Sequence, residues 1–160
     1  MRRFLLLTGV IVLTAGTAAA QTKISGTADF GKSDQQLMLP AGDAAGHAVG
    51  AAQRKCTWSK PLEVNGEKSK EGVSVASMDA TGNTARTRGY HVTTTDAGDK
   101  YIVSFQGTAM LKDGAEQSEK GTWMFIGGTG KLKGIKGKGT YSCTPSGDGM
   151  SCDVEGETTP

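Results

Sequence analysis

The stretch that decides the fold runs from Gly121 to Tyr141 and reads GTWMFIGGTGKLKGIKGKGTY. Two short runs of apolar and aromatic residues flank a segment that is rich in glycine and lysine. A segment of this kind can cradle a phosphate, contact nucleic acid or connect two strands of a sheet. The choice between these three interpretations bounds the function of the whole chain.

The phosphate interpretation fails on spacing. A P-loop requires G-x-x-x-x-G-K-[ST], but Gly130-Lys131 is followed by Leu132, and Phe125 stands where the first glycine is needed. The dinucleotide pattern G-x-G-x-x-G fails as well, because Lys133 occupies the position of its third glycine. The sequence therefore argues against a nucleotide or phosphate cofactor.

The charge balance argues against a nucleic-acid partner. The chain carries 18 basic and 16 acidic residues, and two of the basic ones are Arg2 and Arg3 near the N-terminus. The rest of the chain is therefore neutral overall, whereas a nucleic-acid binder needs a net basic surface. We interpret the lysines between Lys131 and Lys138 as solvated side chains that protect a strand edge.

The first twenty residues have the layout of a signal peptide. Arg2 and Arg3 precede the apolar run 4–13, and the small residues 18–20 form a cleavage site. That run is too short to span a bilayer, and no later apolar run is longer. We expect a signal peptide over 1–20, a single domain over 21–160 without a transmembrane segment, and a secreted or periplasmic protein.

The pattern of the remaining chain is typical of an all-β fold. Short alternating runs are separated by turn residues such as Asn-Gly and Asp-Gly. The expected strands cover residues 24–30, 35–39, 47–58, 71–80, 84–95, 100–111, 116–126, 136–145 and 150–158. About eight strands with short connections predict a sandwich or a barrel. We expect a single eight-stranded antiparallel up-and-down barrel.

Two groups of apolar side chains are candidates for the barrel interior. Side chains alternate along a strand, so Tyr101, Val103 and Phe105 share one face of the strand over 100–111. For the same reason Trp123 and Phe125 share one face of the strand over 116–126. Whether the two groups meet depends on the register of the connection over 111–116. A two-residue turn separates the groups, and a connection one residue longer stacks them. The joined stripe is either plain core or the wall of an apolar ligand pocket.

The cysteines predict one disulfide. A two-residue turn at Gly147-Asp148 places Cys143 directly opposite Cys152, within reach of a disulfide bond. An oxidising compartment favours such a bond. We prefer this pair to a bridge with Cys56, which is then either buried or available for a dimer.

The sequence carries no recognisable catalytic motif. His47 and His91 lie 44 residues apart without a third ligand, so no metal site is expected, and we interpret both as structural. The acidic residues Glu63, Asp79 and Glu119 are candidates without an assignable role. We therefore name no catalytic residue and no cofactor.

The opening stretch resembles a segment of the allene oxide cyclase and dirigent proteins, and above all of their bacterial secreted relatives. The resemblance is carried by Trp123-x-Phe125, by the loop Gly127, Gly128, Thr129 and Gly130, and by Gly137-x-Gly139-Thr140-Tyr141. It extends over residues 46–156. The resemblance implies a β-barrel that holds a small apolar or phenolic molecule, and it implies cyclase or isomerase chemistry as an alternative. No functional residue is transferred by it.

Three functions remain, and each predicts a different interior. The first is an exported binding protein for a small apolar or aromatic molecule, with an open cavity that lacks ionisable groups. The second is an isomerase-like or cyclase-like enzyme, with a carboxylate or histidine directed into the cavity. The third is a structural barrel filled with side chains. A homo-oligomer is compatible with all three.

Overall fold

The computed structural model describes residues 21–159, so the predicted signal peptide lies outside the described residues. Those residues form β1 (Thr22–Phe30), β2 (Gln35–Pro40), β3 (His47–Lys60), β4 (Glu63–Val64), β5 (Glu67–Thr81), β6 (Thr84–Thr95), β7 (Lys100–Lys112), β8 (Ala115–Gly128), the 3-10 turn η1 (Gly130–Leu132), β9 (Lys136–Ser146) and β10 (Gly149–Thr159). None of the helical segments among residues 21–159 is long and apolar enough to cross a membrane.

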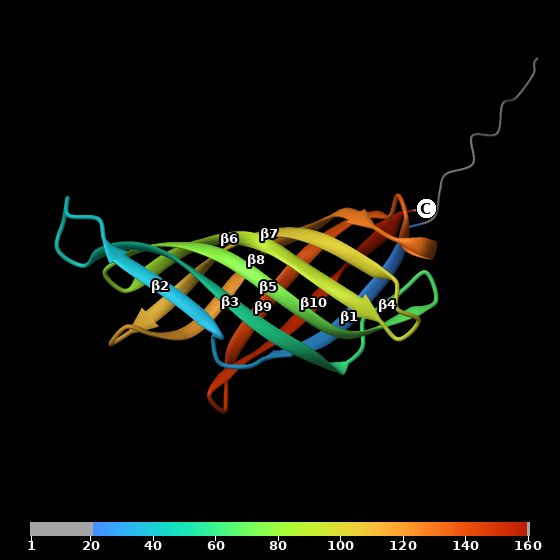
Figure 1. Cartoon of the computed structure of the whole chain (residues 1–160), viewed down its shortest axis with the longest axis horizontal. Coiled ribbons are helices and arrows are strands. Elements are labelled where there is room, and N and C mark those ends of the chain that lie inside the picture. Colours follow the sequence, from blue (N-terminus) through green and yellow to red (C-terminus); the bar gives the residue numbers. More distant parts are fainter. Residues whose placement is uncertain (1–20, 160) are drawn as a thin grey trace, which may run out of the picture.

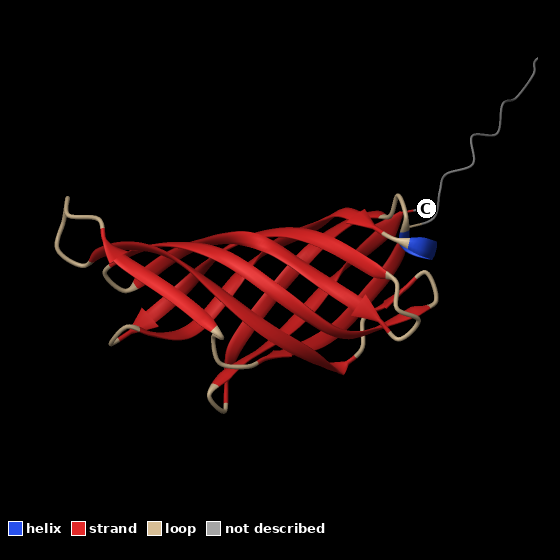
Figure 2. Ribbon diagram, in the orientation of Figure 1, coloured by secondary structure: helices blue, strands red, loops and turns tan. Residues whose placement is uncertain are grey.

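Eight of the strands close into an up-and-down antiparallel barrel (Figures 1 and 2). The neighbours around the barrel are β1, β3, β5, β6, β7, β8, β9 and β10, and β10 pairs with β1 to complete the ring. The predicted fold is confirmed. Two further strands extend it: β2 pairs with β3 beyond the point where β1 ends, and β4 forms a hairpin with the start of β5.

The β7–β8 hairpin answers the question of register. Its turn consists of Asp113 and Gly114, with φ angles of 52° and 76°, and it has two residues, as in a tight hairpin. Strict alternation from this turn would place Phe105 and Trp123 on opposite faces. The structure instead pairs these two residues directly, so that both side chains face the interior.

A bulge in β8 accounts for this difference. Leu111 pairs with Glu116, but the next residue on β7, Met110, pairs with Ser118, which leaves Gln117 as an extra residue. A bulge shifts the alternation of all residues that follow it. The two groups of apolar side chains therefore lie on one interior face, although the turn itself is short.

One end of the barrel is packed solid. The main core cluster consists of Ile24, Leu62, Val64, Tyr101, Val103, Trp123, Phe125, Leu132 and Ile135. Leu132 belongs to η1, which folds across this end at the right of Figure 1. The backbone N–H of Lys131 donates to a side-chain oxygen of Asp99 (3.0 Å), and the Lys100 N–H donates to Thr129 Oγ1 (2.8 Å). The loop with Gly127, Gly128, Thr129 and Gly130 thus closes the barrel and is anchored to the start of β7.

Several interior glycines make room for aromatic rings. The indole of Trp123 lies across β9 and β10, where a Cβ on Gly139 or Gly156 would approach its Cζ2 atom to 2.7 or 2.5 Å. The ring of Tyr141 lies in the same way over Gly121, where a Cβ would be 2.6 Å from Cε1. The glycines of the opening stretch therefore serve the interior of the barrel as well as its turns.

Fewer strands reach the opposite end of the barrel. The β9–β10 hairpin stops short of the end that is reached by the β2–β3 and β7–β8 turns, as Figure 1 shows. Small side chains fill the extension, where Ala80, Ala85 and Ala109 form a second buried cluster against Met38 and Leu111. The interior between this alanine cluster and the solid end is where side chains leave space.

His47 joins the β2–β3 loop to β5 on the surface of this end. Its Nδ1 lies 2.6 Å from Asp43 and its Nε2 lies 3.0 Å from Asp79. Both ring nitrogens donate only when the imidazole is protonated. Hydrogen bonds to Asp43 and then to Asp79 raise the pKa of His47, and the hydrogen bond to His47 lowers the pKa of Asp43.

The stability of the protein is expected to depend on pH because of the contacts of His47 with Asp43 and Asp79. Folding raises the pKa of His47, so its contribution to the free energy of unfolding is fully present below its ordinary pKa of 6.5. That contribution is lost as the pH rises through the pKa of His47 in the folded protein. His47→Gln should therefore destabilise the protein at about pH 5.5 and have little effect at about pH 9. Urea denaturation at both pH values measures this, and an equal loss at both would contradict it.

The outer wall of β5 to β8 carries an apolar patch. It includes Val73, Val75, Tyr90, Met124 and Ile126, and Tyr90 is 60% exposed. Val75 pairs directly with Tyr90, so the patch is continuous across at least these two strands. A homo-oligomer stays a prediction of the sequence.

Candidate functional site

The barrel contains a cavity of about 140 Å³ between its solid end and the alanine cluster. Its walls are mainly apolar, with aromatic rings contributed by β1, β3, β7, β8 and β9. These rings belong to Phe30, Trp58, Tyr101, Phe105, Trp123, Phe125 and Tyr141. Several polar side chains also reach the cavity, so the barrel is neither filled nor purely apolar inside.

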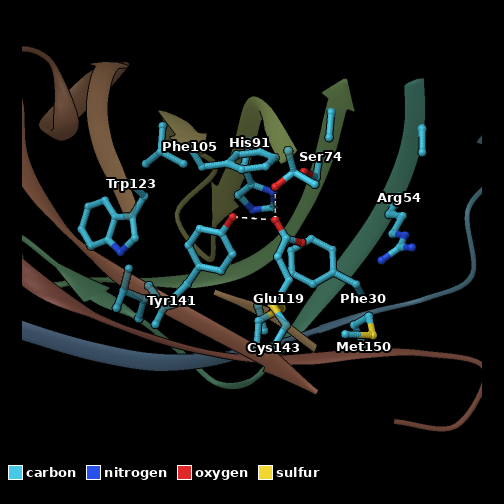
Figure 3. Close-up of a pocket in the computed structure, with 18 of the residues that line it drawn as sticks. Phe30, Arg54, Ser74, His91, Phe105, Glu119, Trp123, Tyr141, Cys143 and Met150 are labelled. Atoms are coloured by element: carbon cyan, nitrogen blue, oxygen red, sulfur yellow. Dashed lines mark hydrogen bonds between the residues drawn. A yellow bond between two sulfur atoms is a disulfide. The ribbon is translucent and has the colours of Figure 1, made fainter. Parts of the chain in front are cut away.

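Glu119 of β8 is at the centre of the polar side chains (Figure 3). Its Oε1 atom accepts hydrogen bonds from the hydroxyl of Thr87 and from the Tyr141 hydroxyl (2.7 Å). Burial, and then the nearby Glu119 carboxylate, raises the pKa of Tyr141. Tyr141 therefore stays protonated and acts as a donor, held in place by the glycine beneath its ring.

A second carboxyl group lies beside Glu119. Glu116 makes an ion pair with Arg54 of β3, with 3.1 Å between Oε2 and Nη2, and Arg54 Nε also donates to Ser33 Oγ (3.2 Å). Strands β3 and β8 are not neighbours in the barrel, so this ion pair crosses the interior. Burial is the main cause that raises the pKa of Glu116, and the nearby Glu119 raises it further. The positive charge of Arg54 lowers the pKa and offsets part of this increase.

The bulge in β8 brings the two carboxyl groups together. Glu116 and Glu119 are three residues apart, and strict alternation would direct them to opposite faces of the strand. The extra residue Gln117 lies between them, so both side chains line the cavity. Burial and the neighbouring Glu119 therefore favour the protonated form of Glu116 by raising its pKa.

His91, which lines the cavity, forms a buried neutral pair with Cys56. Their Nε2 and Sγ atoms are 3.8 Å apart. Burial lowers the pKa of His91 to about 4 and raises the pKa of Cys56 to about 12. At neutral pH the thiol is therefore protonated and the imidazole is uncharged, so this pair does not supply a thiolate nucleophile.

Three buried polar atoms at the cavity have no hydrogen-bond partner among residues 21–159. They are Trp58 Nε1, His91 Nδ1 and Glu116 Oε1. Unpartnered buried polar atoms are rare in folded proteins and each is unfavourable. All three belong to residues that line the cavity, although the atoms themselves have almost no accessible surface.

The structure places all five predicted interior residues on the inner face of the barrel, and all five line the cavity. Tyr101, Val103, Trp123 and Phe125 belong to the main core cluster, and Phe105 packs against it. Ligand contact by these residues stays a prediction. The predicted disulfide is present, and Cys143 pairs directly with Cys152 across the β9–β10 hairpin. Cys56 is free and buried, which is one of the two outcomes expected for it.

The sequence analysis missed most of the polar site. Of the three candidate acids, Glu119 lies in the cavity, Asp79 faces outward to His47, and Glu63 is exposed on β4. Arg54, Glu116 and Tyr141 were not considered. Arg54 is a charged residue in the alternating set that is otherwise Ala52, Cys56 and Trp58, and this was the available signal for it. The bulge concealed Glu116. Among the described residues, no group of three or more potential ligands is arranged to hold a metal.

Comparison with known proteins finds similarity of fold. No family model matches the chain, and no curated protein matches it. Six chains of solved structures match it.

One is a protein of unknown function of the DUF3224 family from Shewanella oneidensis MR-1, at 18% identity and a TM-score of 0.47, over 88% of this chain and 99% of that chain. Another is a pterocarpan synthase dirigent protein, at 10% identity and a TM-score of 0.47, over 96% of both chains. A third is described as a pyocyanin demethylase, at 17% identity and a TM-score of 0.41, over 82% of this chain and 98% of that chain. The function of this chain is therefore argued from its own site.

Proposed function

We propose that this protein binds a small, largely apolar molecule with one ring inside the barrel. The observation that carries the proposal is the cavity of about 140 Å³, with aromatic walls and three unpartnered buried polar atoms. An apolar cavity of about 150 Å³ in a protein core is large enough to bind benzene. The size of the cavity therefore favours a single ring with a short substituent.

The arrangement of the walls supports the same proposal. Phe105 and Tyr141 meet edge to face with 6.0 Å between their ring centres, and Trp123 and Phe125 do so at 5.1 Å. Such rings offer both faces and edges to an aromatic ligand. The polar group of the ligand would lie toward Glu116 and Glu119, where a hydrogen-bond partner is lacking.

Filling the cavity is expected to abolish binding while the fold is kept. Ala52 lines the cavity, and its neighbour Ala51 on the same strand is exposed on the outer wall. Ala52→Leu adds three carbon atoms to the cavity, and Ala51→Leu adds the same atoms outside. With benzyl alcohol as the probe, NMR titration should show that the affinity falls about tenfold or more in Ala52→Leu only.

Two results would contradict this proposal. One is the absence of benzyl alcohol binding to the unchanged protein at concentrations of about 10 mM, well above the range of weak fragment binding. The other is an equal loss of affinity in both variants. Thermal denaturation of both variants is the control, because extra atoms in a core can also destabilise the fold by about 1–3 kcal/mol.

The second candidate function is an isomerase-like or cyclase-like enzyme that uses the same cavity. The specific observation in its favour is the pair of Glu116 and Glu119, because a carboxyl group with a raised pKa can act as a general acid near neutral pH. Tyr141 would orient the Glu119 carboxylate through its hydrogen bond. Binding is required in both functions, so the cavity-filling test applies to both.

We also infer that the protein is secreted or periplasmic. The Cys143–Cys152 disulfide supports this location, because disulfides persist in oxidising compartments. The apolar segment at residues 4–13, preceded by two arginines, supports it independently.

A further inference from the structure

The charges in the cavity do not balance. Two carboxyl groups, Glu116 and Glu119, face one cation, Arg54, among the described residues that line it. His91 is the other basic side chain at the cavity, and burial keeps it neutral. A buried carboxylate without a compensating cation is unfavourable, so a second cation in the cavity would be stabilised by these carboxyl groups.

We propose that the ligand of this cavity carries one positive charge, as a small aromatic ammonium whose charged group lies between Glu116 and Glu119. This inference rests on the proposed function and names the chemical class of the ligand. The ring of the ligand lies against Phe105 and Trp123, which line the apolar part of the cavity.

The unpartnered oxygen at Glu116 is the first argument for an ammonium. Oε1 of Glu116 is buried and makes no hydrogen bond among residues 21–159, while Oε2 is occupied by Arg54. Oε1 has almost no accessible surface, so an ammonium reaches it only when the Glu116 side chain rotates toward the cavity. The three donors of the ammonium can then satisfy Oε1 and Glu119 together. Hydrogen bonds between two charged groups are about twice as strong as neutral ones.

The aromatic walls are the second argument. Tyr141 and Phe105 pack edge to face, and both rings line the cavity that contains Glu119 (Figure 3). The faces of aromatic rings attract cations, most strongly where water is excluded. A cavity with carboxyl groups and aromatic rings therefore favours a cation over a neutral molecule of the same shape.

An anionic ligand fits the site less well. Arg54 already donates to Glu116 through Nη2 and to Ser33 through Nε. An anion would have to displace the Glu116 carboxylate from Arg54 and would then lie beside two carboxyl groups. The negative charges of the ligand and of these carboxyl groups would repel each other strongly in a cavity of low dielectric constant.

Ligand binding is then linked to proton release. The groups that face Glu116 and Glu119 are Arg54 from β3, Tyr141 from β9 and His91 from β6. Without ligand, the raised pKa of Glu116 favours a proton on the pair. An ammonium takes the place of that proton, so its affinity increases as the pH rises through the pKa of Glu116, provided that the amine itself stays protonated.

Three probes of one shape test the proposal. Benzylamine, benzyl alcohol and benzoate share a ring with one substituent carbon and differ in charge. Calorimetry on the full mature chain should show that benzylamine binds about tenfold more tightly than benzyl alcohol, and that benzoate binds most weakly. Repeating the benzylamine titration in buffers with different ionisation enthalpies should reveal release of a proton.

Matched variants identify the carboxyl groups that matter. Glu119→Gln keeps an oxygen that accepts from Thr87 and Tyr141 but removes the charge. It should bring benzylamine and benzyl alcohol to within about threefold of each other. Glu155→Gln on β10 is the control, because Glu155 is exposed and its replacement changes the net charge by the same amount. The control should keep the tenfold preference.

The outcomes separate this inference from the proposed function. If benzyl alcohol and benzylamine bind equally, or if benzoate binds best, the cationic ligand is wrong and the binding function stands. If Glu155→Gln removes the preference as well, the effect is one of overall charge and the proposal is overturned. If none of the probes binds, the proposed function itself is contradicted.

Discussion

Replacing Trp123 with alanine is expected to lower the free energy of unfolding by about 3–5 kcal/mol. The side chain is 6% exposed, it belongs to the main core cluster, and its Nε1 donates to the carbonyl oxygen of Thr140 (3.1 Å). Its indole also occupies the space above Gly139 and Gly156. Removing it therefore leaves a cavity and breaks the hydrogen bond to the Thr140 carbonyl oxygen.

Urea denaturation monitored by circular dichroism measures this loss. Met124→Ala is the control, because Met124 is the next residue on β8, faces outward and is 53% exposed. It should change stability by less than about 0.5 kcal/mol. A comparably small loss in Trp123→Ala would show that the indole is a mobile wall of the pocket and would contradict the core assignment.

The large expected loss changes how the pocket has to be tested. The sequence leaves open whether Trp123 belongs to a core or to the wall of a ligand pocket. In the structure it lines the cavity and also belongs to the core, so loss of binding in Trp123→Ala has two explanations. Ala52 is the better position, because its replacement fills the cavity without removing core contacts.

Replacing Leu132 with alanine should cost about 2–5 kcal/mol. Leu132 has no exposed surface and is the buried residue of η1, the turn that closes the solid end of the barrel. Its loss is expected to open this end to water, because no other residue of η1 is buried. The midpoint of thermal denaturation should fall, and hydrogen exchange of the η1 amides should become faster.

Lys133→Ala is the matched control for Leu132. Lys133 follows directly and is exposed, so its replacement should leave both the midpoint and the exchange rates unchanged. If Leu132→Ala were as stable as this control, the glycine-rich loop would be a surface connection and not a closure of the barrel. Such a result would contradict a structural role of the stretch from Gly121 to Tyr141 in closing the barrel.

Much of the fold was predictable because it depends on local chemistry. Asn-Gly and Asp-Gly turns fix where the chain reverses, and Asn65 and Gly66 have φ angles of 49° and 78° as such a turn requires. The pairing of Cys143 with Cys152 follows from a single hairpin with a two-residue turn. These turns and the disulfide could therefore be predicted, because each depends only on residues that are close in the sequence.

The bulge at Gln117 is different, because nothing in the local sequence requires it. Without the bulge, Trp123 and Phe125 would face solvent. Burying a large aromatic side chain is worth about 1.5–3 kcal/mol, which exceeds the loss of one pairing in the ladder. The closed barrel offers an interior for these rings, and the bulge lets Glu116, which precedes it, share that interior with Glu119, which follows it.

The polar site likewise exists only in the closed barrel. Arg54 and Glu116 are 62 residues apart and lie on strands that are not neighbours, so their contact depends on closure of the ring between β10 and β1. The sequence alone determined the strands, most of the turns, the disulfide and the aromatic residues of the interior. Tertiary structure decided which carboxyl groups share the cavity, because that depends on how an extra residue is accommodated when the barrel closes.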